Sequence, residues 1–121
     1  MKYMLLIYDD PSIPSPERGT SEGDERSAQW GVYTQQLIDD GVFVAGDALQ
    51  PTDSGTTVRV RGGERLVTDG PFADTKEWLA GFYILDVPDL DRAIEYAGKI
   101  PNVAEGSTEI RPVMEVPAAA M

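Results

Sequence analysis

Nine consecutive residues combine opposite charges with a rigid turn, in the order Asp69-Gly70-Pro71-Phe72-Ala73-Asp74-Thr75-Lys76-Glu77. This loop holds four ionisable side chains between two segments that are typical of strands. Such a loop can direct a carboxylate and an ammonium into one cleft. One hypothesis follows: Asp69 accepts a proton, and Lys76 binds an anionic substrate group or stabilises the negative charge that develops.

Simpler roles for the same side chains remain open. The carboxylate of Asp69 could bind backbone amides within its own turn, as aspartate commonly does. Lys76 and Glu77 could form a solvated surface network with Asp74 or Asp69, which would add little stability. The structural and the functional role can coexist at one position.

Two further residues join Lys76 and Glu77 as candidates for substrate binding. Arg111 occupies a polar position of an expected strand, where it could bind a substrate carboxylate with two hydrogen bonds or pair with Glu109. Tyr83 lies in an apolar strand, and an aromatic residue there is usually part of the core. A pocket lined by such residues would suit a small aromatic or otherwise apolar ligand.

The residue types that are missing restrict the chemistry. The chain has 121 residues and contains neither cysteine nor histidine. Disulfides, thiolate nucleophiles and sulfur-ligated zinc are thereby excluded, as is the commonest general base near neutral pH. The sequence has no EF-hand spacing, phosphate-binding loop or dinucleotide-binding fingerprint. We expect no metal and no cofactor, so acid–base chemistry must use carboxylates, lysine or tyrosine.

Acidic residues outnumber basic ones by 21 to 10, which gives a net charge of -11. This charge repels DNA and anionic membrane surfaces, so we expect neither nucleic acid nor membrane as a partner. No apolar run approaches the roughly 20 residues of a membrane helix. The first residues lead into a strand-like segment without a signal-peptide cleavage pattern. We expect a cytoplasmic protein.

Hydrophobic patterning predicts six strands and two helices. The strands are expected at residues 3–8, 42–47, 56–61, 64–68, 81–87 and 107–114. Gly62-Gly63 forms a two-residue hairpin turn between the third and the fourth strand.

The two helices carry recognisable start signals. The first is expected over residues 22–40, with Ser21 as the capping residue of a weak capping box. The second follows Asp89, a good N-cap, and ends at Pro101.

This order of elements predicts an α+β fold: a ferredoxin-like β-α-β-β-α-β unit with an added hairpin strand in the middle. Two helices can cover only one face of the antiparallel sheet. The strands at 3–8 and 81–87 are nevertheless apolar on both faces, apart from Asp86, so the second face also needs a cover. A second copy of the chain supplies it most economically, which predicts a homodimer that forms an α/β barrel.

Residues 68–77, followed by Gly81-Phe82-Tyr83, resemble the signature of the DGPF-domain proteins of the YCII-related (YciI-like) family. Further matches at residues 2–8, 49–51, 56–59 and 109–113 extend the resemblance over nearly the whole chain. It implies a ferredoxin-like subunit in a dimeric α/β barrel. Relatives with this fold include cofactor-free isomerases and monooxygenases, and some DGPF members are associated with extracytoplasmic-function sigma factors. The histidine–aspartate pair proposed for the YciI-like branch has no counterpart here.

We therefore expect one YCII-related domain over residues 1–115 and a frayed tail over 116–121. The first functional hypothesis is a small cofactor-independent enzyme of lyase or isomerase type that acts on a small organic molecule. The alternative is a non-catalytic ligand-binding or regulatory module, with a sigma factor as a partner that the resemblance implies. In a third interpretation the charged loop only builds a turn in a stable dimer.

Overall fold

A four-stranded antiparallel sheet forms the centre of the computed structural model, which describes residues 1–117. Its strands are β1 (Lys2–Asp9), β2 (Phe43–Ala48), β5 (Trp78–Asp86) and β6 (Ser107–Pro112), in the order β2-β5-β1-β6. This order and the chain direction of each strand are those of a ferredoxin-like unit, as predicted.

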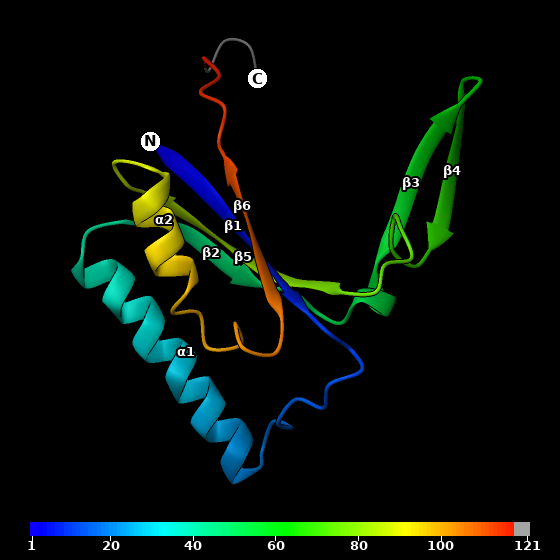
Figure 1. Cartoon of the computed structure of the whole chain (residues 1–121). Helices are drawn as coiled ribbons and strands as arrows, with labels where there is room; N and C mark the ends of the chain where they lie inside the picture. The colour runs from blue at the N-terminus through cyan, green and yellow to red at the C-terminus, as the bar shows by residue number, and fades with distance from the viewer. Residues whose placement is uncertain (118–121) are drawn as a thin grey trace.

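Both helices, α1 (Ser21–Asp39) and α2 (Leu90–Ala97), lie on the same face of the sheet (Figure 1). They close a single core against that inner face. The side chains of this core are all less than a tenth exposed, and they include Leu5, Leu37, Leu85, Tyr96 and Ile100. The tail expected at 116–121 falls largely on residues 118–121, which lie outside the described residues.

The first helix cap differs from the sequence-based expectation. Thr20, not Ser21, is the N-cap of α1, because its hydroxyl accepts the Gly23 amide at 3.0 Å. Ser21 is the first helical residue. Asp89 caps α2 as expected, accepting the Arg92 amide at 2.9 Å.

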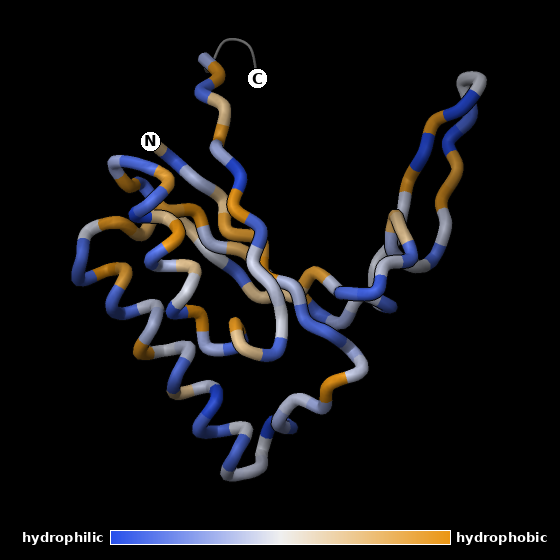
Figure 2. The backbone as a smooth tube through the Cα atoms, in the orientation of Figure 1, coloured by the Kyte–Doolittle hydropathy of each residue, from blue (hydrophilic) through white to orange (hydrophobic). Residues whose placement is uncertain are grey.

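Between β2 and β5 the chain forms a short 3-10 helix, η1 (Thr52–Ser54), and then a hairpin of β3 (Thr56–Arg61) and β4 (Glu64–Asp69). The two hairpin strands pair with each other and not with the central sheet. The turn glycines have φ values of 59° and 78°, the left-handed backbone that the expected Gly62-Gly63 turn requires. Figure 1 shows the hairpin standing away from the body of the molecule, and Figure 2 shows polar and apolar residues alternating along it.

Strands β5 and β6 also differ from expectation at their ends. β5 begins at Trp78 rather than at residue 81, because its pairing with β1 continues past a bulge opposite Ile7 and Tyr8 to reach Asp9. β6 ends at Pro112 rather than at residue 114.

No helix within residues 1–117 is long and apolar enough to cross a membrane.

Gly81→Ala should destabilise the fold, because β2 passes too close to this position. A methyl group at residue 81 would lie 2.7 Å from the Asp47 carbonyl oxygen and 3.2 Å from the Ala48 Cα. We expect a loss of about 1–3 kcal/mol in the free energy of unfolding, measured by urea denaturation. Gly31→Ala is the matched control: it has open space on α1 and should gain up to about 1 kcal/mol. Equal stability of the two variants would contradict the β2–β5 contact.

Candidate functional site

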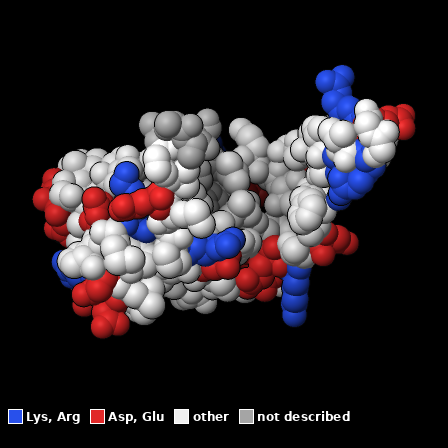
Figure 3. All heavy atoms as spheres, turned by 90° about the horizontal axis from the view of Figure 1, so that it is seen from above, with Lys and Arg blue, Asp and Glu red and all other residues white. Residues whose placement is uncertain are grey.

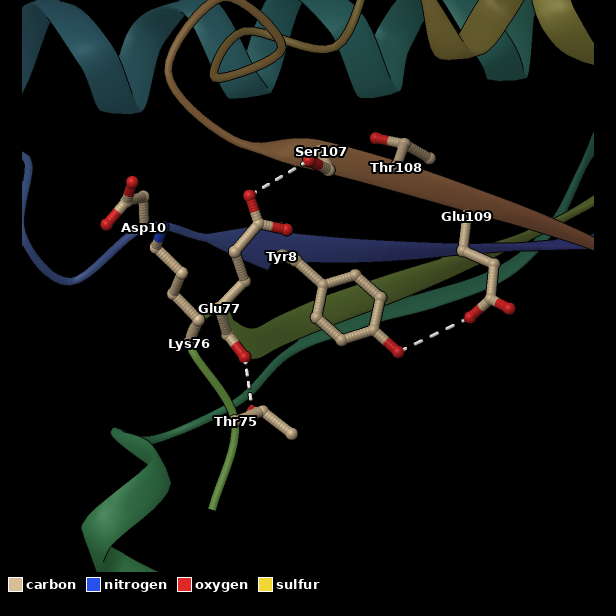
Figure 4. A pocket seen from close by; sticks show the side chains of 8 residues that line it. All are labelled: Tyr8, Asp10, Thr75, Lys76, Glu77, Ser107, Thr108 and Glu109. Atoms are coloured by element: carbon tan, nitrogen blue, oxygen red, sulfur yellow. Dashed lines mark hydrogen bonds between the residues drawn. The ribbon is translucent and has the colours of Figure 1, made fainter. Parts of the chain in front are cut away.

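A hollow of about 620 Å³ opens on the outer face of the sheet, at the end of β1 (Figure 4). Three segments that are distant in the sequence meet there. β1 contributes Tyr8, the loop before β5 contributes Lys76 and Glu77, and β6 contributes Ser107 and Glu109. The register places Tyr8 opposite Ser107, so the two side chains share one face of the sheet.

Two hydroxyl groups hold Glu77 in the hollow, one through its carboxylate and one through its backbone. The Ser107 hydroxyl donates a hydrogen bond of 3.0 Å to Glu77 Oε1. The Thr75 hydroxyl donates to the main-chain oxygen of Glu77, which fixes the backbone of the loop at the same residue. Because Glu77 is half-buried and bonded through one oxygen, its second carboxylate oxygen remains free to accept a proton from a bound molecule.

Tyr8 faces the same hollow, and its hydroxyl donates to Glu109 Oε1 across a long 3.4 Å. Partial burial raises the pKa of Tyr8, and the negative charge and hydrogen bond of Glu109 raise it further. The positive charge of Arg111 opposes this shift. Tyr8 is therefore a protonated hydrogen-bond donor at neutral pH.

Lys76 brings a positive charge to the open side of the hollow. Its ammonium lies near Asp10, whose pKa is lowered chiefly by hydrogen bonds from the Ser12 hydroxyl (2.6 Å) and amide (2.9 Å) and, to a lesser degree, by Lys76. The carboxylate of Asp10 therefore already accepts two hydrogen bonds, both from Ser12. Lys76 remains available to attract negative charge on a ligand.

Carboxylate, ammonium and phenol together can transfer a proton and stabilise an oxyanion. Within residues 1–117 no group of three or more acidic residues is arranged to hold a metal ion.

The structure brings only some of the predicted site residues together. Lys76 and Glu77 line the hollow, and Arg111 lies on the same face, opposite Met4. Tyr83 lies on the inner face, where it is 9% exposed and packed in the core. Asp69 is exposed at the end of β4, away from the residues that line the hollow. Its carboxylate forms no hydrogen bond in the described part of the chain, so its role stays a prediction.

Sequence reasoning did not single out Tyr8, Ser107 or Glu109 as partners of the charged loop. The alternation of side chains along each strand could have pointed to them. It places Tyr8 in β1 and Glu109 in β6 on the face of the sheet that lies away from the helices. The missing information was the register between β1 and β6, which joins the two ends of the chain.

Comparison with known proteins identifies the family. The model of the YCII-related domain matches residues 1–117. The chain belongs to this family. An uncharacterised protein of Rhizobium meliloti (strain 1021) is 37% identical over 116 residues, which are 93% of this chain and 92% of that protein.

A solved structure of the same general fold supports the ferredoxin-like architecture of this YCII-related protein. It is 5-chloro-2-hydroxyhydroquinone dehydrochlorinase (TftG) from Burkholderia phenoliruptrix AC1100, in complex with 2,5-dihydroxybenzoquinone. The two chains superpose with a TM-score of 0.52 over 96% of each, at 14% sequence identity. At this identity the likeness shows the fold alone.

Two substitutions should move the pKa of Tyr8 in opposite directions. Glu109→Gln removes a negative charge and should lower it, whereas Arg111→Gln removes a positive charge and should raise it. The measurement is a spectroscopic titration of tyrosinate, with the Tyr8→Phe protein subtracted to remove the other tyrosines. Shifts of the same sign in both variants would contradict the contacts described for Tyr8.

Proposed function

We propose that this YCII-related protein is a small cofactor-independent enzyme of lyase or isomerase type that acts on a small organic molecule in the outer hollow. The observation that carries this proposal is the placement of Glu77, Lys76 and Tyr8 around one hollow (Figure 4). The same general fold in a dehydrochlorinase supports it further. The chain contains no histidine, so a carboxylate, a lysine or a tyrosine must move the proton, and Glu77 is the carboxylate that Ser107 holds in the hollow.

In the proposed reaction, the Glu77 carboxylate removes a proton from a carbon next to a carbonyl group. The electron pair of that C–H bond forms a C=C bond, and the π pair of the carbonyl moves to its oxygen. The Lys76 ammonium stabilises the negative charge there, together with the Tyr8 hydroxyl, which turns its one proton from Glu109 to this oxygen. Where the substrate carries a C=C bond next to that carbon, the dienolate takes the proton back from Glu77 at the far carbon, which gives an isomer. Where the β-carbon carries a leaving group such as chloride, the enolate expels it as the anion, which gives an elimination product. Because its pKa is raised, Tyr8 keeps the proton that its hydrogen bond needs.

We further propose that two copies of the chain form a dimeric barrel by packing their outer sheet faces together. The register pairs Leu6 with Phe82 and Met4 with Ile84, so these four apolar side chains form one patch. Both helices lie on the opposite face (Figure 1). The second copy would cover this patch and close the open side of the hollow.

The projecting hairpin supports the same assembly. An isolated two-stranded hairpin is marginally stable in water, so a hairpin of this length gains stability from a surface to pack on. Val58, Val60 and Val67 share one of its faces, and each is about 60% exposed. The hairpin has three arginines against two acidic residues in a chain of net charge -11, and Figure 3 shows blue side chains gathered on it. The acidic body of a second copy is a complementary surface.

Glu77→Gln should reduce turnover by about 10²–10⁴-fold without loss of folding, because the amide cannot accept the proton. The assay uses small ketones and chlorinated hydroquinones, with conversion followed by proton NMR and chloride release. Asp69→Asn is the matched amide variant outside the hollow and should retain most of the activity.

A loss of activity in Asp69→Asn alone would assign the proton transfer to Asp69 instead of Glu77. If the wild-type protein converts none of the compounds, the catalytic proposal fails. The non-catalytic ligand-binding or regulatory role, with a sigma factor as the candidate partner, then takes its place.

Leu6→Glu should separate the proposed dimer, because it places a charge in the centre of the apolar patch. Sedimentation at micromolar concentration should show a dimer for the wild type and a monomer for this variant. Val32→Glu adds the same charge at a position of α1 that is 72% exposed, and it should remain dimeric. A wild-type monomer would contradict the assembly.

A further inference from the structure

The two faces of the projecting hairpin differ in how their own chain uses them. Residues directly opposite each other on β3 and β4 share a face, and the register places Arg59 opposite Leu66 on one of them. The loop that follows the hairpin packs against this face. Phe72 lies beneath the Arg59 guanidinium, with 5.6 Å between the guanidinium carbon and the ring centroid, and the Thr57 hydroxyl donates to the Gly70 carbonyl at 3.0 Å. We call this the loop-side face.

The opposite face, which we call the valine face, is left uncovered. The register places Val58 opposite Val67 and Val60 opposite Arg65 on it. The three valines are largely exposed. Arg65 is exposed as well, and it forms no ion pair in the described part of the chain. Because the loop that leads back to the chain's own hollow packs on the loop-side face, the valine face is free for another molecule.

The outer hollow is short of positive charge. Its lining carries the carboxylates of Asp10, Glu77 and Glu109 but only one ammonium, that of Lys76. Glu109 is exposed, and within residues 1–117 it forms no ion pair and accepts only the long hydrogen bond from Tyr8. A second copy that covers the hollow removes water from these carboxylates, which is costly unless a cation pairs with them. The covering surface therefore has to bring positive charge.

The hairpin is suitably placed and long enough to supply this charge to a second copy. It leaves the sheet at the end of β1, where the hollow lies, and extends on the side away from the helices (Figure 1). A strand of six residues spans about 20 Å, which exceeds the roughly 10 Å between two packed sheets. If the two-fold axis of the dimer runs parallel to the strands, the same ends of both sheets meet. Each hairpin then lies beside the hollow of the other copy.

From these features we propose that Arg65 pairs with the second copy's Glu109 across the dimer interface, at the outer hollow. The valine face packs on the second copy, so each site is built from residues of both chains. The pairing draws Glu109 away from Tyr8, which frees the Tyr8 hydroxyl proton for a ligand oxygen. Arg65 is thus a positioning residue. This inference rests on the dimer of the proposed function and not on its reaction, so association tests it without a substrate.

Reversing either charge should weaken the dimer. Arg65→Glu places two carboxylates against each other in both symmetric contacts, and Glu109→Arg places two guanidinium groups there. Each variant alone should raise the dissociation constant of the dimer at least about tenfold, as expected for a close charge pair at an interface. The measurement is sedimentation equilibrium at low salt, with the wild type as reference.

Mixing the two variants tests whether the pair joins different chains. In a mixed dimer both contacts again join a carboxylate to a guanidinium, so an equimolar mixture should associate nearly as tightly as the wild type. An ion pair within one chain would not be restored by mixing. A chain that carries both Arg65→Glu and Glu109→Arg should also dimerise, which shows that the two substitutions are compatible with folding.

Arg61→Glu is the matched control, because Arg61 lies on the loop-side face opposite Glu64, and it should dimerise like the wild type. Unchanged affinity in Arg65→Glu would overturn the assignment. A mixture that associates no more tightly than the separate variants would overturn it too, most clearly where the doubly substituted chain does dimerise. A wild-type monomer would remove the dimer and this contact with it.

Discussion

The two central strands, β1 and β5, are apolar on both faces, and this constraint organises the molecule. Their inner side chains are buried beneath α1 and α2, where Leu5 and Leu85 are fully enclosed. Their outer side chains are only half-buried, because residues 1–117 provide no second layer of helices. The sheet therefore separates a closed core on its inner side from a half-buried apolar patch on its outer side.

The inserted hairpin does not interrupt the central sheet. It extends from the connection between β2 and β5, and these two strands still pair directly with each other. The charged loop then leads the chain back from the hairpin to the sheet. This path explains why its two ends differ: Asp69 belongs to the detached hairpin, whereas Lys76 and Glu77 arrive at the end of the sheet.

Local patterns in the sequence predicted the six strands, the two α-helices and their order. Strand alternation, the Gly62-Gly63 turn and the Asp89 cap each depend on only a few neighbouring residues. They were less reliable at boundaries: Thr20 and Ser21 are both suitable caps, and only the Thr20 geometry decides between them. The site itself depends on register over long separations. Ser107 meets Glu77, and Asn102 meets Asp9, through contacts that no local spacing could reveal.

The end of β1 contributes side chains to both the outer hollow and the inner cavity, a space of about 590 Å³ on the inner face of the sheet beneath the N-terminal half of α1. A bulge in β5 leaves Ala80 without a partner opposite Ile7 and Tyr8, and its carbonyl accepts the Leu49 amide at 2.8 Å instead. Bulges of this kind redirect side chains beside functional sites. Side chains alternate along β1 itself, so Tyr8 points to the outer hollow and the next residue, Asp9, to the inner cavity. The groups of the outer hollow lie open to solvent, whereas in the inner cavity Asn102 bonds to Asp9 and Tyr83 bonds to Thr34.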